Sequence, residues 1–186
     1  LSYQNIPFFF LLNSASTSDE NGNVIIYTNG RGVFNKNHLL VSNCVGLNDG
    51  EWTDRFWPDP KEGYPGDQDI LILGHPGDKN LFYILHKTRV YYPIGYDSTE
   101  IRVSLVDVEK NNGQGEVLFK NQYFYNTQNL LVSYLTAIRH QNQRDWWVLQ
   151  PTNSDKIKTF LIDSSCIKVM TDQDAYQTFT TFRSSA

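Results

Sequence analysis

Short apolar segments separated by polar turns recur along the chain, and helical spacing of the apolar residues is almost absent. The segments VIIYT (residues 24–28), LFYILH (residues 81–86) and WWVL (residues 146–149) are rich in β-branched and aromatic side chains, which favour strands. The longest helix candidate, residues 126–139, is equally compatible with a strand. The pattern therefore predicts an all-β chain of antiparallel strands.

Three strand-turn-strand hairpins are predicted, with turns formed by DENGN, HPGDKN and HQNQRD, and each hairpin is followed by a further strand. In the first turn, Asn21 and Gly22 indicate a type I′ turn, because both central residues of such a turn have a positive φ. The predicted hairpins pair residues 14–18 with 24–28, 69–73 with 81–86, and 134–139 with 146–149, and the further strands cover residues 32–35, 100–108, 116–119 and 156–163.

These hairpins define three similar units, which cover approximately residues 14–41, 69–120 and 134–170. Units of three or four antiparallel strands that recur along a chain are typical of β-propeller blades. A closed propeller needs about 4 to 8 blades. We therefore expect residues 1–186 to be a single β-propeller-type domain, or a fragment of a larger propeller, with an insertion loop at residues 42–68. The first residue is Leu1 rather than methionine, so we also expect a trimmed or partial polypeptide.

Four segments carry a family resemblance: SASTSDENGNVIIYTNGRGVFNKNH (Ser14–His38), DILILGHPGDKNLFYILH (Asp69–His86), VSLVDVEKNNGQGEVLFKN (Val103–Asn121) and LTAIRHQNQRDWWVLQ (Leu135–Gln150). In this order they resemble the N-terminal propeller-like region of large secreted Bacteroidetes proteins. Those proteins often carry PKD-type domains and end in a gliding-motility-associated, type IX secretion sorting domain. The resemblance implies secretion and a role at the cell surface, and it supplies no catalytic residues. Gln143 and Cys166 depart from it, because both stand where the family usually has glycine.

The composition limits the kinds of partner that the protein can bind. Among the 186 residues, 40% are hydrophobic, 19% are charged and the formal net charge is −4, which argues against a nucleic-acid surface. No apolar run reaches the roughly 18 residues needed to span a bilayer, since the IPFFFLL run of residues 6–12 is too short. The composition therefore predicts no nucleic-acid partner and no membrane span, and the family resemblance implies a secreted or cell-surface, outer-membrane-associated protein. Its partner would be a surface protein or glycan, or other domains of a larger secreted assembly.

The two cysteines do not form a disulfide framework. Cys44 and Cys166 either pair in an oxidising compartment or remain as two free thiols, and the sequence leaves both alternatives open.

The DENGN turn has a partial resemblance to a calcium loop. Asp19, Asn21 and Asn23 alternate as in D-x-[DN]-x-[DN], but the glycine falls at the fourth position and Gly30 occupies the twelfth, where an acid is needed. We therefore interpret the string as a structural turn in which Asp19 binds nearby backbone N–H groups. The four histidines also lack metal-ligand spacing, and no nucleophile, phosphate-loop or dinucleotide motif is present. We expect no metal, no cofactor and no catalytic residue.

The insertion is the segment in which we expect binding. Aromatic and charged residues alternate there, and long loops on rigid β scaffolds often bind ligands. The alternative is that the aromatic side chains fold back and cover one of the units. The predicted binding residues are Trp52, Asp54, Arg55, Phe56, Trp57, Asp59 and Tyr64. Trp146 and Trp147 differ from these, because adjacent strand positions face opposite sides of a sheet and at least one ring is expected to pack between units.

The functional prediction is a non-enzymatic, secreted or cell-surface β-propeller module that binds a protein or glycan, within a type IX secreted protein associated with gliding or adhesion. One alternative is a carbohydrate-active propeller enzyme whose catalytic residues lie partly outside this sequence, with acids such as Asp54 or Glu62 contributing. The other is a structural scaffold that only spaces neighbouring domains.

Overall fold

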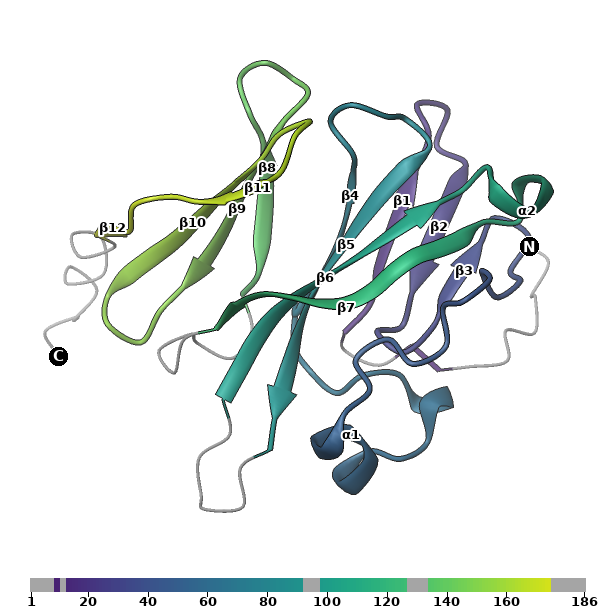
Figure 1. Cartoon of the computed structure of the whole chain (residues 1–186), viewed down its shortest axis with the longest axis horizontal. Helices are drawn as coiled ribbons and strands as arrows, with labels where there is room; N and C mark the ends of the chain where they lie inside the picture. Colours follow the sequence, from purple (N-terminus) through teal and green to yellow (C-terminus); the bar gives the residue numbers. More distant parts are fainter. Residues whose placement is uncertain (1–8, 11–12, 92–97, 127–133, 175–186) are drawn as a thin grey trace, which may run out of the picture.

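Three antiparallel sheets of consecutive strands make up the computed structural model, which describes residues 9–10, 13–91, 98–126 and 134–174 (Figure 1). The first sheet has the order β1 (Ala15–Ser18), β2 (Val24–Thr28), β3 (Val33–Asn35). The second has the order β4 (Ile70–Gly74), β5 (Leu81–Val90), β6 (Ser98–Asp107), β7 (Glu116–Asn126). The third has the order β11 (Ile167–Val169), β10 (Lys156–Ile162), β9 (Trp146–Pro151), β8 (Thr136–Arg139), and β12 (Gln173–Asp174) also pairs with β10.

The all-β prediction is confirmed, and the three predicted hairpins correspond to β1–β2, β4–β5 and β8–β9. Within the described ranges, the sheets do not close into a barrel or a propeller. Part of the longest helix candidate is strand β8, and its residues 127–133 lie outside the described residues.

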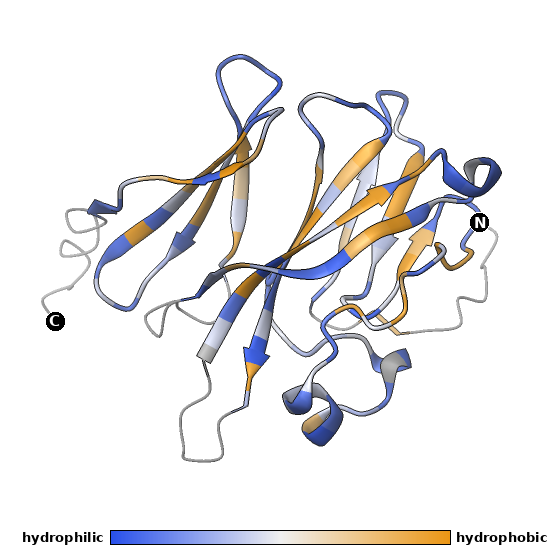
Figure 2. Ribbon diagram, in the orientation of Figure 1, coloured by the Kyte–Doolittle hydropathy of each residue, from blue (hydrophilic) through white to orange (hydrophobic). Residues whose placement is uncertain are grey.

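The second sheet lies between the other two and has an apolar core on each face (Figures 1 and 2). Successive side chains of a strand point to opposite faces, so β5 contributes to both cores. Phe82 and Ile84 join the core shared with the first sheet, whereas Leu85 joins the core shared with the third sheet. The strands of this sheet are therefore apolar at consecutive positions, as in LFYIL.

A short connection after β3 joins the first sheet to the second. The backbone N–H of Ser42 donates to the carbonyl of Gly115 at 3.2 Å, and the N–H of Val117 donates to the carbonyl of Ser42 at 2.9 Å. This parallel bridge places the end of the first unit against β7, the last strand of the second sheet.

The β1–β2 turn is held by its own aspartate, as predicted. Asp19 Oδ1 accepts hydrogen bonds from the backbone N–H groups of Asn21 and Asn23 at 2.9 and 2.8 Å. Gly22 has φ of +83°, whereas Asn21 is not among the residues with positive φ, so the predicted type I′ turn is wrong. A single left-handed residue completes this hairpin, because Asp19 supplies the remaining constraint.

The turn between β6 and β7 is left-handed. Asn111, Asn112 and Gly113 have φ of 53°, 58° and 78°, although this segment is labelled α2 (Lys110–Gly113). Asparagine and glycine adopt this conformation at low cost, which explains the NNG string. Strand β7 follows this turn directly.

Residues 42–68 are not only loop, and this corrects the sequence prediction. They contain α1 (Glu51–Phe56) and the 3₁₀ helix η1 (Pro60–Glu62). Asp59 begins η1 by accepting a hydrogen bond from the backbone N–H of Lys61 at 2.9 Å, and Pro60 occupies its first position. Helices this short contain too few turns to produce a periodic apolar pattern.

The two cysteines are not paired, and two of the histidines differ in their burial. Cys44 is a buried free thiol and Cys166 an exposed one, so no disulfide joins them. His75 follows β4 and its ring packs on Tyr83, whereas His86 is fully buried within β5. The predicted strand of residues 81–86 is therefore too short at its end, because β5 continues beyond His86 to Val90.

Candidate functional site

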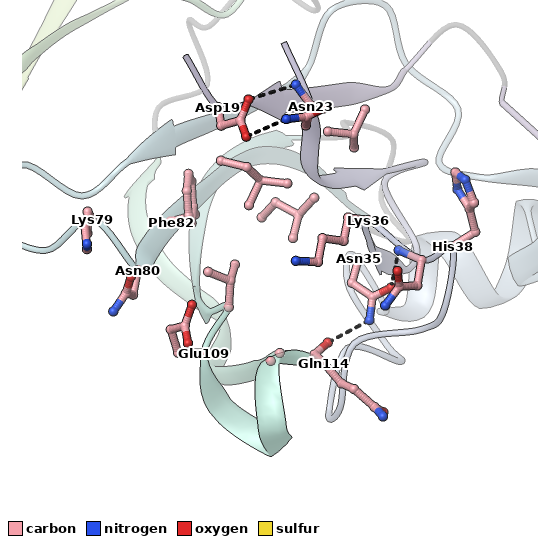
Figure 3. A pocket seen from close by; sticks show the side chains of 17 residues that line it. Asp19, Asn23, Asn35, Lys36, His38, Lys79, Asn80, Phe82, Glu109 and Gln114 are labelled. Carbon is pink, nitrogen blue, oxygen red and sulfur yellow. Dashed lines mark hydrogen bonds between the residues drawn. The ribbon is translucent and has the colours of Figure 1, made fainter. Parts of the chain in front are cut away.

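Hydrophilic turns gather at one end of the molecule, at the top of the view in Figures 1 and 2. Beside them a cavity of about 900 Å³ opens between the β1–β2 hairpin, the segment after β3 and the β6–β7 turn (Figure 3). We call it the turn-lined cavity. Its volume lies in the range of roughly 300–1,000 Å³ that is usual for ligand sites. Its lining consists of Asp19, Asn23, Val24, Ile25, Ile26, Asn35, Lys36, Asn37, His38, Lys79, Asn80, Phe82, Val108, Glu109, Gly113, Gln114 and Gly115.

Some polar groups of the cavity form hydrogen bonds within its walls. Asp19 Oδ2 accepts from the Asn23 amide at 3.0 Å, and this bond is the main cause of the lowered pKa of the Asp19 carboxyl. Asn35 Oδ1 accepts from the backbone N–H groups of Asn37 and Leu39. The Asn35 amide donates to the carbonyl of Gln114 at 3.0 Å, which ties β3 to the β6–β7 turn. These residues fix the shape of the site.

Other polar groups of the cavity have no partner among the described residues. Within the described part of the chain, the side chains of Lys36, Lys79, Asn80 and Glu109 make no hydrogen bond or ion pair. Figure 3 shows Lys36 extending into the cavity, with Asn80 and Glu109 on the opposite side. The apolar residues between them include Ile26 and Phe82, which belong to the core. The cavity therefore presents both signs of charge and an amide around an apolar floor.

A second cavity of about 570 Å³ adjoins the first, and the two share Ile25, Lys79 and Phe82. It lies between the β4–β5 and β8–β9 turns and is also lined by Arg139 and Trp146. The Arg139 guanidinium lies 3.7 Å from the centre of the Trp146 ring, a cation–π contact. The side chains of these two residues therefore form one wall of this cavity.

Trp146 also connects two sheets. Its Nε1–H donates to the carbonyl of Gly74 at 2.9 Å, and its ring packs on the core between the second and third sheets. Trp147 points away and lies beside His140. The prediction that one of the two rings packs between units is confirmed for Trp146.

Two of the predicted binding residues are interior residues. Tyr64 is 1% exposed and Trp52 is 8% exposed, and their rings are 6.1 Å apart. The Tyr64 hydroxyl accepts a hydrogen bond from the backbone N–H of Arg89 at 2.7 Å, and burial raises the pKa of Tyr64 to about 12. The alternative that the aromatic side chains cover a unit therefore holds for Trp52 and Tyr64, which are not available to a ligand.

The remaining predicted binding residues lie near the surface, away from the cavities described above. Asp54, Arg55, Phe56 and Asp59 are exposed and Trp57 is half-buried. The Arg55 guanidinium lies 4.9 Å from the ring centre of Tyr91 and 5.7 Å from that of Phe56. The carbonyl of Trp57 accepts a hydrogen bond from Arg31 at 3.1 Å. A binding role for the exposed members stays a prediction.

A buried polar network attaches the insertion to β5. His86 Nδ1 lies 2.6 Å from Asn48 Oδ1, and His86 Nε2 lies 3.2 Å from the Ser104 hydroxyl. The Asn48 amide nitrogen donates to the carbonyl of Gly30, so Asn48 Oδ1 is the acceptor and His86 Nδ1 carries the hydrogen. Burial lowers the pKa of His86 to about 3. His86 is therefore a neutral structural residue.

The sequence did not predict the turn-lined cavity, although the predicted turns DENGN and HPGDKN supply part of its lining. The strings DENGN, NKNH, GDKN and EKNNGQG supply most of the polar lining. Packing of the sheets brings these turns to one end of the molecule. In the sequence, only the regular order of strands and turns indicates that arrangement.

The described residues contain no group of three or more His, Cys, Asp or Glu side chains placed to hold a metal ion. No helix in this part of the chain is long and apolar enough to cross a membrane. Comparison of the chain with protein-family models, with curated proteins and with solved structures gives no match.

Proposed function

We propose that this chain is a non-enzymatic binding module that holds a glycan in the turn-lined cavity. The observation that carries the proposal is a set of polar side chains without partners in the described part of the chain, Lys36, Lys79, Asn80 and Glu109, around an apolar floor. Sugar hydroxyls both donate and accept hydrogen bonds, so a site with ammonium, amide and carboxylate groups satisfies them. The floor, which includes Phe82, suits the apolar face of a sugar ring.

The proposal includes a propeller-type arrangement and a secreted or cell-surface setting, within a type IX secreted protein associated with gliding or adhesion. Stacking of three consecutive sheets, with both faces of the middle sheet covered, supports blade-like packing. The four segments that resemble the secreted Bacteroidetes family support the setting. In a propeller, the cavity would lie at the end of the blades where the hairpin turns meet.

A glycan array followed by calorimetry tests the binding function. We expect the wild-type chain to bind a glycan, and the Lys36→Ala/Glu109→Gln double variant to bind it at least about tenfold more weakly, or about 1.4 kcal/mol. Lys61→Ala is the matched control, because Lys61 is an exposed lysine of η1 outside the cavity. Equal affinity of all three proteins would contradict the assignment of the cavity.

The exposed part of the insertion is a second candidate for binding. Arg55 and Phe56 form a charged aromatic surface with Tyr91, which suits a protein or glycan partner. Binding that is lost in Arg55→Ala/Phe56→Ala but kept in the cavity variant would move the site to the insertion.

The rival carbohydrate-active enzyme requires two carboxyl groups in distinct roles. In the cavity, Glu109 is unpartnered, but Asp19 is held by three hydrogen bonds and its pKa is lowered, so it stays ionised as a turn residue. Turnover of a chromogenic glycoside panel that is abolished by Glu109→Gln would overturn the non-enzymatic proposal. A protein that bound no glycan and no partner would favour the spacer alternative.

A further inference from the structure

The second cavity, of about 570 Å³, differs from the turn-lined cavity in its charge, and we call it the adjoining cavity. The described lining of the turn-lined cavity contains two lysines and two acidic residues, so its charges balance. The adjoining cavity is lined by three cationic side chains, those of Lys79, Arg139 and Arg144. Among the residues that the structure describes, Asp78 is the one acidic residue of its lining. This excess of positive charge occurs in a chain whose formal net charge is −4.

Two of these charged groups already have partners. Arg144 Nε lies 2.8 Å from Asp145 Oδ1, and this hydrogen bond is the main cause of the lowered pKa of Asp145. Asp78 Oδ1 accepts a hydrogen bond at 2.9 Å from a backbone N–H of its own turn. By contrast, Lys79 and Arg139 have no carboxylate partner in the described part of the chain. These two side chains are therefore the cationic groups that remain available to a ligand.

The Arg139 guanidinium is held in position by the protein itself. The β8–β9 register places Arg139 directly opposite Trp146, and this pairing explains why the guanidinium lies 3.7 Å from the centre of the Trp146 ring. Its Nη1 donates to the carbonyl of Arg144 at 2.8 Å. Its Nε and Nη2 have no hydrogen-bond partner among the described residues. A guanidinium fixed in this way loses little freedom on binding, and its planar fork fits the oxygens of a carboxylate or a similar oxyanion.

We propose that the glycan is acidic, and that Arg139 binds the carboxylate or sulfate group of one of its sugar units in the adjoining cavity. A neighbouring sugar unit lies in the turn-lined cavity, since the two cavities share Ile25, Lys79 and Phe82. Figure 3 shows Lys79 and Phe82 at one side of the turn-lined cavity. Lys79 therefore adds a second positive charge where the two sugar units meet. The inference rests on the proposed glycan-binding function and names the class of glycan.

Calorimetry of the full chain with matched oligosaccharides tests the class of glycan. The probes are tetragalacturonate, tetramannuronate, the carboxyl-reduced form of each, and a sulfated galactose tetramer with its unsulfated form. We expect at least one acidic tetramer to bind about tenfold more tightly than its neutral counterpart, because a hydrogen bond to a charged group is stronger than one between neutral groups. This preference should decrease as the salt concentration is raised, since salt screens exposed charges.

Variants of Arg139 assign the preference to its guanidinium. Arg139→Gln should bind the acidic and the neutral tetramer with equal affinity, whereas a variant that failed to fold would bind neither. Arg139→Lys keeps the positive charge but loses the planar fork, so it should keep only part of the preference. Arg89→Gln is the matched control, because the Arg89 guanidinium also lies over a tryptophan ring, at 5.1 Å from the ring centre of Trp52. Arg89 lines neither cavity, so this variant should keep the full preference.

The possible outcomes separate this inference from the glycan-binding function on which it rests. A preference for the uronate tetramers that depends on Arg139 would support the inference with a carboxylate as the bound group. The same dependence for the sulfated tetramer would support it with a sulfate. Equal binding of acidic and neutral tetramers, or a preference that persists in Arg139→Gln, would overturn the inference and leave the glycan-binding function in place. A chain that bound none of the tetramers would also overturn it, and the glycan array would then test the binding function independently.

Discussion

The insertion and the turn-lined cavity use their polar groups in opposite ways. In the insertion, Asn48 is fully buried and bonds to His86, Gly30 and Thr53, and the Tyr64 hydroxyl is also satisfied internally. At the cavity, the side chains of Lys36 and Glu109 have no partner among the described residues. The insertion, with its aromatic and charged sequence, is therefore mainly structural. The turn residues around the cavity have polar groups that remain available to a ligand.

This contrast teaches that residue type alone does not identify a binding surface. Trp52 and Tyr64 have the large, flat side chains of a binding loop, but the same property makes their burial favourable. A binding residue has to keep its polar atoms free until the ligand arrives. The following predictions test the contrast, from the largest expected effect to the smallest.

Tyr64→Ala should destabilise the protein by about 3–5 kcal/mol, because it removes a fully buried ring from the packing of the insertion. Urea unfolding measures the change. Tyr64→Phe keeps the ring and loses only the hydrogen bond to Arg89, so its cost should be about 1 kcal/mol. If Tyr64→Ala were as stable as wild type, the structural role of the insertion would be wrong.

Asn48→Ala should cost about 2–3 kcal/mol, because it leaves the buried His86 N–H and the carbonyl of Gly30 without partners. The same unfolding experiment applies. The matched control is Asn37→Ala: Asn37 is an exposed asparagine whose side chain makes no hydrogen bond in the described structure, and its replacement should change stability by less than about 0.5 kcal/mol.

Lowering the pH from 6.5 to 5 should cost about 1.6 kcal/mol through His86. The folded-state pKa of about 3 lies below the ordinary value of 6.5, so only the unfolded chain takes up the proton in this window. Stability is complete above pH 6.5 and falls by up to about 1.4 kcal/mol per pH unit as the pH decreases towards the folded pKa. Urea midpoints at several pH values measure this slope, and His86→Gln should remove it. An equal slope in both proteins would assign the effect to other groups.

Lys36→Ala/Glu109→Gln should change the free energy of unfolding by less than about 0.5 kcal/mol, because neither side chain has a partner among the residues that the structure describes. The same variant should lose glycan binding. A large loss of stability would show that these groups are structural, and the contrast between the two regions would disappear.

Arg55→Ala should also have only a small effect on stability, about 0.5 kcal/mol, through the loss of its exposed cation–π contact with Tyr91. Glycan affinity at the cavity should be unchanged. A decrease in affinity similar to that of the cavity variant would place part of the site on the insertion.

Much of the fold can be predicted from the sequence, because alternating apolar residues and turn-forming strings define each hairpin locally. The predicted segments 24–28 and 81–86 lie on β2 and β5. The end of β5 was not predictable in this way: His86, Lys87 and Thr88 continue the strand in the interior, where distant residues such as Asn48 and Asp69 satisfy them. Local patterns contain no information about such partners.

The cavity was less predictable for the same reason. Asn35 and Gln114 are far apart in the sequence, and only the packing of the first sheet on the second brings β3 to the β6–β7 turn. A turn residue such as Lys36 looks the same in sequence whether it faces bulk water or a cavity. The sequence also could not show that Trp52 and Tyr64 are buried whereas Phe56 is exposed, because all three belong to one aromatic segment.

The bridge between Ser42 and Glu116 has a consequence for the order in which the protein folds. The hairpins β1–β2 and β4–β5 close short loops, which is fast, whereas this bridge joins segments separated by β4, β5 and β6. The end of the first sheet therefore reaches its final place only after β7 has been synthesised and paired. During synthesis the apolar face of the first unit stays exposed until the second unit has been made. We expect this contact of high sequence separation to form later than the β1–β2 hairpin.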